Sequence, residues 1–232
     1  MTTRNSAQAL ADAASHLVQQ HDVTSVLAQL VQDSAQFIPA DAAAFLARTA
    51  DGTFELLSAS SHKAVEIELY QAQAMTGPCI DAARSGHPTA AVGEAQLLAA
   101  WPEVGRAIVD AGFLAVHAFP MRWQGVTLGG LNLFSTHPDG LDGPSCVLAQ
   151  SFADFATLAV IQPEALADDD LAHRVSEALA GRVVVEQAKG VLAYDLGLDM
   201  EAAYAELVER AVARRSTLGR VAAEVLGEAQ RR

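Results

Sequence analysis

The hydrophobic positions at the start of the chain follow the period of a helix. From Leu10 to Val18, and again from Leu27 to Ile38, apolar residues return every three or four positions, which places them on one side of a helix. From Ala42 onwards this period is lost, and two short apolar runs flank Asp51-Gly52. Both turn residues tolerate a positive φ, so the pattern predicts a β-hairpin there.

The middle of the chain alternates between helical and strand-like patterns. Helical spacing predicts further helices at Lys63 to Ala74, Cys79 to Ser85, Leu97 to Ala111 and Leu141 to Ile161. Strand-like patterns cover Thr89 to Val92, Leu114 to Met121 and Val126 to Phe134, with a turn at Gln124-Gly125 between the last two. Gly129 and Gly130 in the last strand indicate a bulge or a close backbone contact.

A different organisation begins after the segment from Pro163 to Asp170, which interrupts the apolar pattern and is the best candidate for a domain boundary. No strand-like pattern follows this segment. One helix is predicted from Leu171 to Leu192, Asp199 is predicted to cap a second helix, and Ser216 or Thr217 a third. The chain is therefore expected to have a mixed first part and an all-helical second part.

The charged residues are divided unevenly between these two parts. The chain has 15 Lys and Arg against 28 Asp and Glu, a net charge of −13. Residues 1–170 hold 6 basic and 19 acidic residues (6 − 19 = −13), whereas residues 171–232 hold 9 of each (9 − 9 = 0). Because a negative surface repels phosphate, we expect nucleic-acid binding only in the second part.

The composition narrows the class of protein. With 51% hydrophobic and 19% charged residues, the chain is able to build a packed core, which excludes a mostly disordered protein. No charge-free apolar stretch reaches the roughly 18 residues that a membrane span needs. The first residues carry Arg4, Asp12 and His16, where a signal peptide would need an apolar centre. These features predict a soluble cytoplasmic protein.

The sequence contains none of the common catalytic cassettes. G-x-x-x-x-G-K-[ST], H-E-x-x-H, G-x-S-x-G and C-x-x-C are all absent, and the histidines form no pair at metal-ligand spacing, so neither an enzyme nor a metal site is predicted. The only cysteines, Cys79 and Cys146, are expected to be reduced thiols. Cys79 follows Gly77-Pro78 at a predicted helix start, where the helix dipole would lower its thiol pKa. The alternative role of Cys79 is that of a small buried apolar residue.

The strand from Leu114 to Met121 offers candidates for a ligand pocket. Alternation places His117 on the same face as Phe119 and Met121. If that face lines a cavity, His117 would be able to bind a ligand, a metal or haem, whereas packing in the core is the more frequent role of such a histidine. His117, Phe119 and Met121 are therefore taken together with Cys79 as the pocket candidates.

The C-terminal part resembles an ANTAR domain. The resemblance rests on the run from Arg182 to Ala193, whose centre reads Glu-Gln-Ala-Lys-Gly, on Met200-Glu-Ala-Ala-Tyr-Ala-Glu-Leu, and on the helix from Leu218 to Val225. ANTAR domains commonly have Leu-Arg where this chain has Leu207-Val208, which removes a cation from the second helix.

The first 160 residues resemble a GAF domain. The motifs that carry this resemblance are Gly77-Pro-Cys-Ile-Asp-Ala, Trp101-Pro with Gly112, Ala118-Phe-Pro-Met-Arg, and Leu128-Gly-Gly-Leu-Asn-Leu-Phe. The two resemblances imply an α+β chain. Residues 1–165 would form a GAF-like domain with a six-stranded antiparallel sheet, flanking helices and a pocket for an unknown small molecule, and residues 166–232 an ANTAR-like three-helix domain.

Together, the resemblances imply a transcription antitermination regulator. ANTAR domains bind nascent RNA with paired hairpins and six-nucleotide loops, and so prevent formation of a terminator. In this chain Lys189 places a cation beside Gly190, whose missing side chain lets RNA approach closely, and Tyr204 supplies a ring for base stacking. The candidates for RNA contacts are Arg182, Gln187, Ala188, Lys189, Gly190, Tyr204, Arg210, Arg214 and Arg215.

The same residues leave other interpretations open. The helix from Leu141 to Ile161, continuing towards Leu171, is expected to join two copies, so that two tethered tails engage two hairpins. The main alternative is a ligand-binding dimer whose tail contacts protein, which the tail's net charge of zero favours. In that case Tyr204 would be a core residue and Gly190 a helix-packing residue.

An enzyme is the remaining alternative. Some GAF domains reduce methionine sulfoxide with cysteines, and that chemistry would require Cys79 and Cys146 to meet within disulfide reach.

Overall fold

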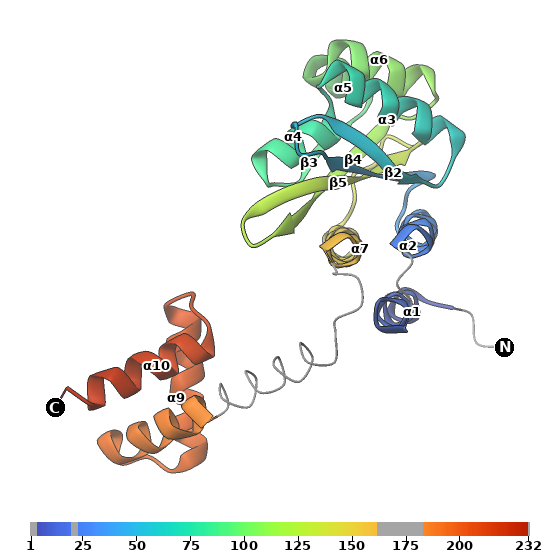
Figure 1. Ribbon diagram of the computed structural model, residues 1–232. Helices are drawn as coiled ribbons and strands as arrows, with labels where there is room; N and C mark the ends of the chain where they lie inside the picture. Colours follow the sequence, from blue (N-terminus) through green and yellow to red (C-terminus); the bar gives the residue numbers. More distant parts are fainter. Residues whose placement is uncertain (1–3, 20–22, 162–182, 232) are drawn as a thin grey trace. The chain divides into compact units, whose positions relative to one another are not determined.

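The computed structural model describes residues 4–19, 23–161 and 183–231. The chain forms two compact units, Met1–Glu164 and Ala165–Arg232 (Figure 1). The predicted boundary from Pro163 to Asp170 lies outside the described residues, as do residues 171–182 of the helix predicted from Leu171 to Leu192.

A five-stranded antiparallel sheet forms the centre of the first unit, with strand order β2-β1-β5-β4-β3. Its strands are β1 (Ala42–Arg48), β2 (Phe54–Ala59), β3 (Thr89–Val92), β4 (Ala115–Trp123) and β5 (Val126–Ser135). Both predicted hairpins are confirmed, since Gly52, Gln124 and Gly125 have positive φ at their turns. The sixth strand implied by the GAF resemblance is not found among the described residues, which supply only the five strands that the patterning indicated.

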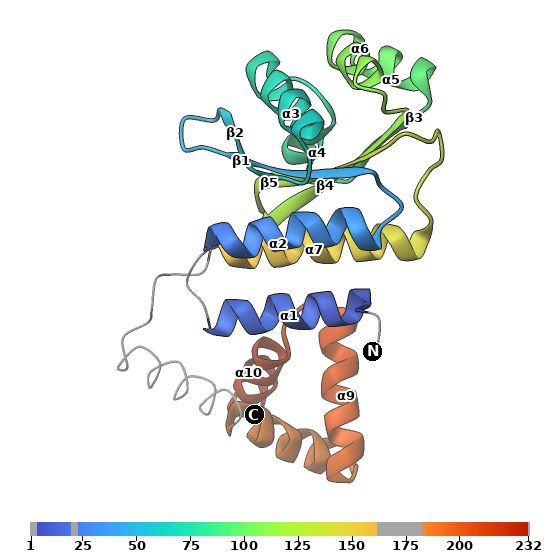
Figure 2. The same ribbon diagram turned by 90° about the vertical axis from the view of Figure 1, so that its right-hand side faces the viewer.

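Helices cover both faces of this sheet (Figures 1 and 2). On one face α2 (Val23–Phe37) and α7 (Gly143–Ile161) lie side by side, with α1 (Ser6–Gln19) packed against both. The other face carries α3 (His62–Ala74), α4 (Pro78–Ser85), α5 (Glu94–Ala100) and α6 (Pro102–Asp110). The sheet thus has helices and a separate interior on each side, and α1 adds a further layer outside α2 and α7 (Figure 2).

Strand alternation decides which interior each side chain enters. On β5, Leu131 and Leu133 belong to the core that α2 and α7 cover, together with Phe152 of α7. Phe134 belongs to the opposite core with Val116, beneath α3, α5 and α6. Side chains two positions apart on one strand thus share an interior, whereas neighbouring ones do not.

The helix predicted from Leu97 to Ala111 is wrong as a single element, because the structure has α5 and α6 in its place. Trp101 stands between them with φ −139° and ψ 85°. The ring of Pro102 disfavours a helical conformation for the residue before it, and Pro102 is well suited to begin the next helix. The helical spacing of the apolar residues continues across this break and conceals it.

Gly129 confirms the close backbone contact predicted in the last strand. Its φ is +159°, and a Cβ at this position would lie 1.9 Å from the backbone oxygen of Leu46. The β4–β5 register shifts nearby, between Met121 and Arg122. A residue with any side chain would therefore push β1 away from β5.

One helix in the described part of the chain, α7, is long and apolar enough to cross a membrane. Phe152, Ala153 and Ala156 of α7 are buried, and the helix packs against α2 and the sheet. A core helix passes the same length and composition test, and this packing indicates that α7 is a core helix of the first unit.

The second unit contains helical residues 183–196, α9 (Met200–Ala213) and α10 (Leu218–Ala229). The predicted caps are confirmed: Asp199 Oδ1 accepts a hydrogen bond from the Ala202 amide at 2.8 Å, and Thr217 Oγ1 one from the Arg220 amide at 3.3 Å. The three segments share one apolar core, which includes Leu192, Leu207 and Val221.

Candidate functional site

The helical segment 183–196 distributes its motif residues over two sides of the second unit. Gln187, Gly190 and Tyr194 follow one another at spacings of three and four residues, which places them on one stripe of the helix. Lys189 and Glu186 belong to a neighbouring stripe. The candidates that are adjacent in sequence therefore face different neighbours, α10 on one side and α9 on the other.

On the α9 side, Lys189 lies over the ring of Tyr204. The Lys189 Nζ atom is 5.6 Å from the ring centroid and 2.9 Å from Glu186 Oε2. This distance from the ring is within the range of a cation–π interaction. The side chain of Lys189 is 16% exposed and that of Tyr204 44% exposed, so Tyr204 does not have the purely internal role that the alternative interpretation requires.

On the α10 side, the stripe with Gly190 forms one wall of an open groove of about 740 Å³. Gln187, Gly190 and Tyr194 line this wall, and Leu226 and Gln230 line the wall opposite. A Cβ added to Gly190 would meet nothing within 4 Å. Gly190 therefore has open space beside it and is not required for packing within the unit.

Tyr194 was missed by the sequence reasoning, although it is 89% exposed and stands at the groove. The spacing of apolar residues indicates the buried side of a helix, so it gives no sign of an aromatic residue on the solvent-facing side. The available signal was its position one helical turn after Gly190, within the motif segment itself.

The remaining candidates differ in how far they are available. Ala188 is fully buried in the core of the second unit, which corrects its assignment as an RNA contact, because its methyl group faces the other helices. Arg182 lies outside the described residues. Val208, which stands where ANTAR domains commonly have Arg, is partly exposed on α9.

Two of the predicted arginines are engaged in ion pairs within the unit. Arg210 Nε lies 2.7 Å from Glu206 Oε1, and a nitrogen of Arg214 lies 2.9 Å from Glu224 Oε2. Arg215 is exposed and follows Arg214, the C-cap of α9, with φ +49°. The Arg214–Glu224 pair is exposed, and exposed ion pairs contribute only about 0–1 kcal/mol, so Arg214 remains able to exchange its carboxylate for a phosphate. The Arg210–Glu206 pair is partly buried.

The four predicted pocket residues of the first unit do not come together. Phe119 and Met121 are buried in the core beneath α2 and α7, whereas Cys79 packs with Ile80 and Leu46 on the α4 side. Alternation along β4 puts His117 on the face of Phe119, not on that of Cys79. The predicted pocket is therefore corrected: its members are divided between the two sides of the sheet.

His117 is a buried structural residue. Its Nε2 accepts a hydrogen bond from the backbone amide of Leu141 at 3.2 Å, and burial lowers its pKa below the ordinary value. A neutral imidazole with its proton on Nδ1 satisfies both observations. The histidine thus holds the loop that leads into α7. Among the described residues, no three His, Cys, Asp or Glu side chains gather as a metal site would require.

Cys79 departs from the expectation for a reactive thiol. It stands at the start of α4 as predicted, but it is completely buried, and burial raises its pKa well above the ordinary value. Desolvation of the thiolate therefore outweighs any effect of the helix dipole. Cys146 packs on the α7 side of the sheet, so the sheet lies between the two thiols that a redox pair would have to join.

A cluster of buried polar side chains was not anticipated from the sequence. Glu68 and Gln71 of α3 and Asn132 of β5 are all fully buried, and Asn132 Nδ2 donates to Glu68 Oε1 at 2.5 Å. Burial raises the pKa of Glu68 to about 8. The sequence signal was weak, because Glu68 and Gln71 appear as ordinary polar positions of an amphipathic helix.

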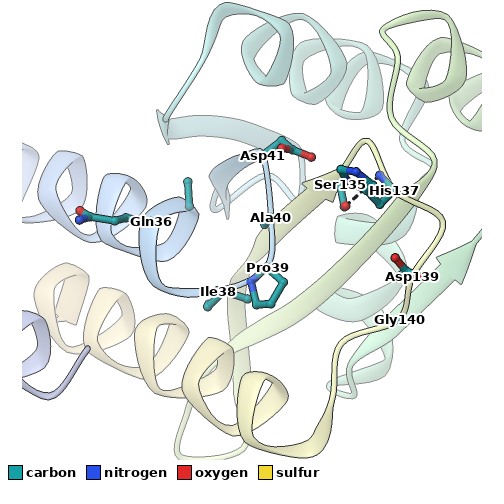
Figure 3. A pocket seen from close by; sticks show the side chains of 10 residues that line it. Gln36, Ile38, Pro39, Ala40, Asp41, Ser135, His137, Asp139 and Gly140 are labelled. Carbon is teal, nitrogen blue, oxygen red and sulfur yellow. Dashed lines mark hydrogen bonds between the residues drawn. The ribbon is translucent and has the colours of Figure 1, made fainter. Parts of the chain in front are cut away.

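A polar pocket of about 400 Å³ lies at the end of the sheet where α2 leads into β1 and β5 leads towards α7 (Figure 3). Asp41 and His137 are among the residues that line it. Asp41 Oδ2 accepts from both the amide and the hydroxyl of Thr136, which lowers the pKa of this carboxyl group. These hydrogen bonds hold the loop after β5 in place, so Asp41 has a structural role.

Comparison with known proteins agrees with this geometry. The family model of the GAF domain matches residues 22–160, and that of the ANTAR domain matches residues 173–226. No curated protein matches the chain.

Solved structures with a similar fold include the phycoerythrobilin-bound GAF domain from a cyanobacterial phytochrome. It is 13% identical with a TM-score of 0.52, and the match covers 69% of this chain and 97% of that one. The GAF domain from the Acinetobacter phosphoenolpyruvate-protein phosphotransferase is 8% identical with a TM-score of 0.54, and the match covers 69% and 94%. The corresponding domain from Coxiella burnetii is 16% identical with a TM-score of 0.52, covering 67% and 92%. At these identities the likeness shows the fold alone.

The two family matches place the chain in a class of protein in which a sensor domain is joined to an RNA-binding domain. The chain belongs to the GAF domain family, whose model matches more than half of it, and it carries an ANTAR domain at its C-terminal side. ANTAR domains are the RNA-binding parts of antitermination regulators, and GAF domains are small-molecule sensors. Both are regulatory domains.

Proposed function

We propose that this protein is a cytoplasmic transcription antitermination regulator whose ANTAR domain binds paired RNA hairpins with six-nucleotide loops and so prevents formation of a terminator. The functional division follows residues 1–165 and 166–232. The GAF domain senses a small molecule, and a homodimer presents two ANTAR domains to the two hairpins, which raises the effective concentration of the second contact.

The exposed ring of Tyr194 beside the groove is the observation that carries the RNA assignment. RNA loops expose unstacked bases, and stacking of a base on an aromatic side chain contributes about 1–3 kcal/mol. The amide groups of Gln187 and Gln230 line the same groove and offer both donors and acceptors to the edge of a base. Gly190 leaves the space that a base or a sugar needs.

The Lys189–Tyr204 pair provides a second place for contact on the neighbouring side of the same helix. Its cation is held by Glu186, and an exposed carboxylate of this kind is readily replaced by a phosphate. The groove beside Tyr194 and the Lys189–Tyr204 pair would then contact one RNA loop from two sides of the helical segment 183–196.

The net charge of zero in residues 171–232 supports recognition of loops over general attraction to RNA. Sequence-independent affinity grows with the number of phosphates that cations neutralise. A neutral domain gains little from this source, so stacking and base contacts must supply a larger share of its affinity.

Binding of the full chain to an RNA with two six-nucleotide-loop hairpins tests the proposal, with a scrambled-loop RNA for comparison at about 50 and about 200 mM salt. Tyr194→Ala is expected to weaken loop-specific binding by about 5- to 150-fold, because stacking is lost. Lys189→Ala is expected to lower the salt dependence by about one phosphate contact. Tyr70→Ala, which removes a partly exposed tyrosine of α3, is the matched control and should bind as wild type.

Gly190→Ala separates RNA contact from folding. The added methyl group meets nothing within the domain, and alanine favours a helix over glycine by about 1 kcal/mol, so the variant should be at least as stable as wild type. Loss of RNA affinity in this stable variant would show that RNA approaches the helix at Gly190.

The alternative, a tail that contacts only protein, makes the opposite prediction. Equal binding of both RNAs, or binding unaffected by Tyr194→Ala and Lys189→Ala together, would reject the antitermination proposal and favour that alternative.

A further inference from the structure

The interior beneath α3 contains three polar side-chain atoms without a hydrogen-bond partner. They are Glu68 Oε2, Gln71 Nε2 and Asn132 Oδ1, and all are shielded from solvent. Among the described residues, no other buried side-chain nitrogen or oxygen atom lacks a hydrogen-bond partner. An unsatisfied buried polar group costs about 1–3 kcal/mol. A bound molecule that forms hydrogen bonds with these three atoms would remove that cost.

The other polar atom of each side chain is already held. Asn132 Nδ2 donates to Glu68 Oε1 at 2.5 Å, and the amide of Cys79 donates to Gln71 Oε1 at 3.3 Å. Gly77 is needed for this arrangement, since a Cβ there would lie 2.3 Å from Gln71 Oε1. The three side chains are therefore fixed by their engaged atoms and present their free atoms in defined positions.

The sheet beneath the cluster has short side chains. Asn132 pairs with Ala44 of β1 and with Ala118 of β4, and Gly130 is the next residue on the same face of β5. Because the side chains of alanine and glycine are small and apolar, the amide of Asn132 is the polar group on this part of the sheet. Glu68 and Gln71 are one helical turn apart above it, and so they face the same region.

At neutral pH the free atoms comprise two donors and one acceptor. Because burial keeps Glu68 protonated up to about pH 8, its Oε2 carries a hydrogen and donates, as Gln71 Nε2 does, whereas Asn132 Oδ1 accepts. The titratable group facing Glu68 from α4 is the thiol of Cys79, which is also neutral in this range. The other charged side chains on β1, β2, α4 and α6 are exposed or bonded elsewhere: Arg48, Glu55, Asp81, Arg84, Glu103, Arg106 and Asp110.

We infer that Glu68, Gln71 and Asn132 recognise the amide group of a small neutral ligand, and this inference rests on the proposed sensing function of the GAF domain. A carbonyl oxygen has two lone pairs, which accept from Glu68 and Gln71, and the neighbouring N–H donates to Asn132. A ketone leaves Asn132 unsatisfied, and an ammonium group offers no acceptor to the two donors. The enclosed atoms become accessible only when α3 or α4 moves, and a sensor requires that its ligand favour one arrangement over another.

The test compares three five-membered rings that differ only in their polar edge: 2-pyrrolidone, cyclopentanone and pyrrolidinium. Their binding to the full chain, without RNA, is measured by ligand-observed NMR at about pH 7 and about pH 9. We expect 2-pyrrolidone to bind at least about tenfold more tightly than cyclopentanone at pH 7, the effect of one satisfied buried group. Its affinity should fall at pH 9, where Glu68 loses the donated hydrogen.

Two variants and a control decide which atoms are responsible. Asn132→Leu should lose the preference for 2-pyrrolidone over cyclopentanone. Glu68→Gln keeps a donor at this position and should retain the preference but lose its decline at pH 9, which also serves if Asn132→Leu does not fold. Glu66→Gln removes an exposed carboxylate of the same helix and should behave as wild type.

Equal binding of the lactam and the ketone, or no binding of either, would overturn the inference and leave the three atoms to a buried water. Stronger binding of pyrrolidinium at pH 9 would also overturn it, because the site would then serve an ionised Glu68. Neither result bears on the RNA measurement, which uses no lactam, so the two proposals fail separately.

Discussion

Glu68 shows how burial changes the role of a single residue. Its sequence neighbours describe an ordinary helix, yet the fold encloses its carboxyl group beside Asn132 and Cys79. Desolvation is the main cause of its raised pKa, and the hydrogen bond from Asn132 only partly offsets it. The same desolvation raises the pKa of Cys79, so both groups of this interior are neutral where their exposed counterparts would be charged or reactive.

A pH dependence of stability follows from the pKa of Glu68. Its value rises from an ordinary 4.5 to about 8 on folding, so between these values the folded state binds more protons than the unfolded state, and stability falls as pH rises. The loss is about 1.4 kcal/mol per pH unit, roughly 3 kcal/mol between about pH 5 and about pH 7.5. Below about pH 4.5 both states are protonated, and above about pH 8 the loss is complete.

Urea unfolding of wild type and Glu68→Gln at these two pH values isolates the effect. Fluorescence reports on the GAF domain, since both tryptophans, Trp101 and Trp123, lie in it. Glu68→Gln should remove most of the difference between the two pH values, and Glu66→Gln should preserve it. An unchanged pH dependence in Glu68→Gln would show that Glu68 ionises normally.

At the scale of an element, α5 and α6 show that a proline can end a helix where the apolar spacing continues. Proline and the residue before it break a helix that apolar spacing would continue, and the two halves then pack against each other. Gly105 of α6 makes this packing close, since a Cβ there would lie 2.2 Å from the backbone oxygen of Leu97. Backbone atoms cannot give way as a flexible side chain does.

Gly105→Ala is therefore expected to destabilise the GAF domain by about 1–3 kcal/mol, the usual cost of overpacking. Urea unfolding followed by tryptophan fluorescence measures it, and Trp101 reports directly because it lies between the two helices. Gly143→Ala at the start of α7, where nothing lies within 4 Å, should stay within about 0.5 kcal/mol of wild type. Equal stability of the two variants would contradict the close packing of α5 and α6.

For the whole molecule, the exposed side of α7 is the surface that fits the proposed homodimer. Val147 of α7 is 70% exposed and Leu158 43% exposed, and their spacing of eleven residues places them on one stripe of the helix. Val18 of α1 is also exposed. The expected continuation of this helix towards Leu171 lies outside the described residues.

Leu158→Asp should weaken the homodimer by at least about tenfold, because a charge would be buried against an apolar partner surface. Sedimentation equilibrium of the 24.3 kDa chain measures the monomer–dimer balance. Val126→Asp, at an exposed valine of the β4–β5 hairpin, is the matched control and should leave it unchanged. A wild-type chain that stays monomeric, or a Leu158→Asp variant that dimerises as wild type does, would place the interface elsewhere or remove it.

The sequence by itself determined the family and the local elements, except for the break between α5 and α6. Apolar period, turn residues and caps are properties of a few consecutive residues, so the hairpins at Asp51-Gly52 and Gln124-Gly125 and the caps Asp199 and Thr217 were predictable. The Glu-Gln-Ala-Lys-Gly segment identified the ANTAR domain for the same reason, since a motif is read within one stretch of chain.

Tertiary structure alone decided which residues meet. Whether Cys79 shares an interior with Met121 depends on strand register and on which face each helix covers, and these follow from packing between distant segments. The same packing buried Ala188, turned Tyr194 and Gln187 towards one groove, and brought Glu68 against Asn132, 64 residues away in the chain. Burial depends on what covers a residue, and that cover comes from parts of the sequence that no local pattern relates to it.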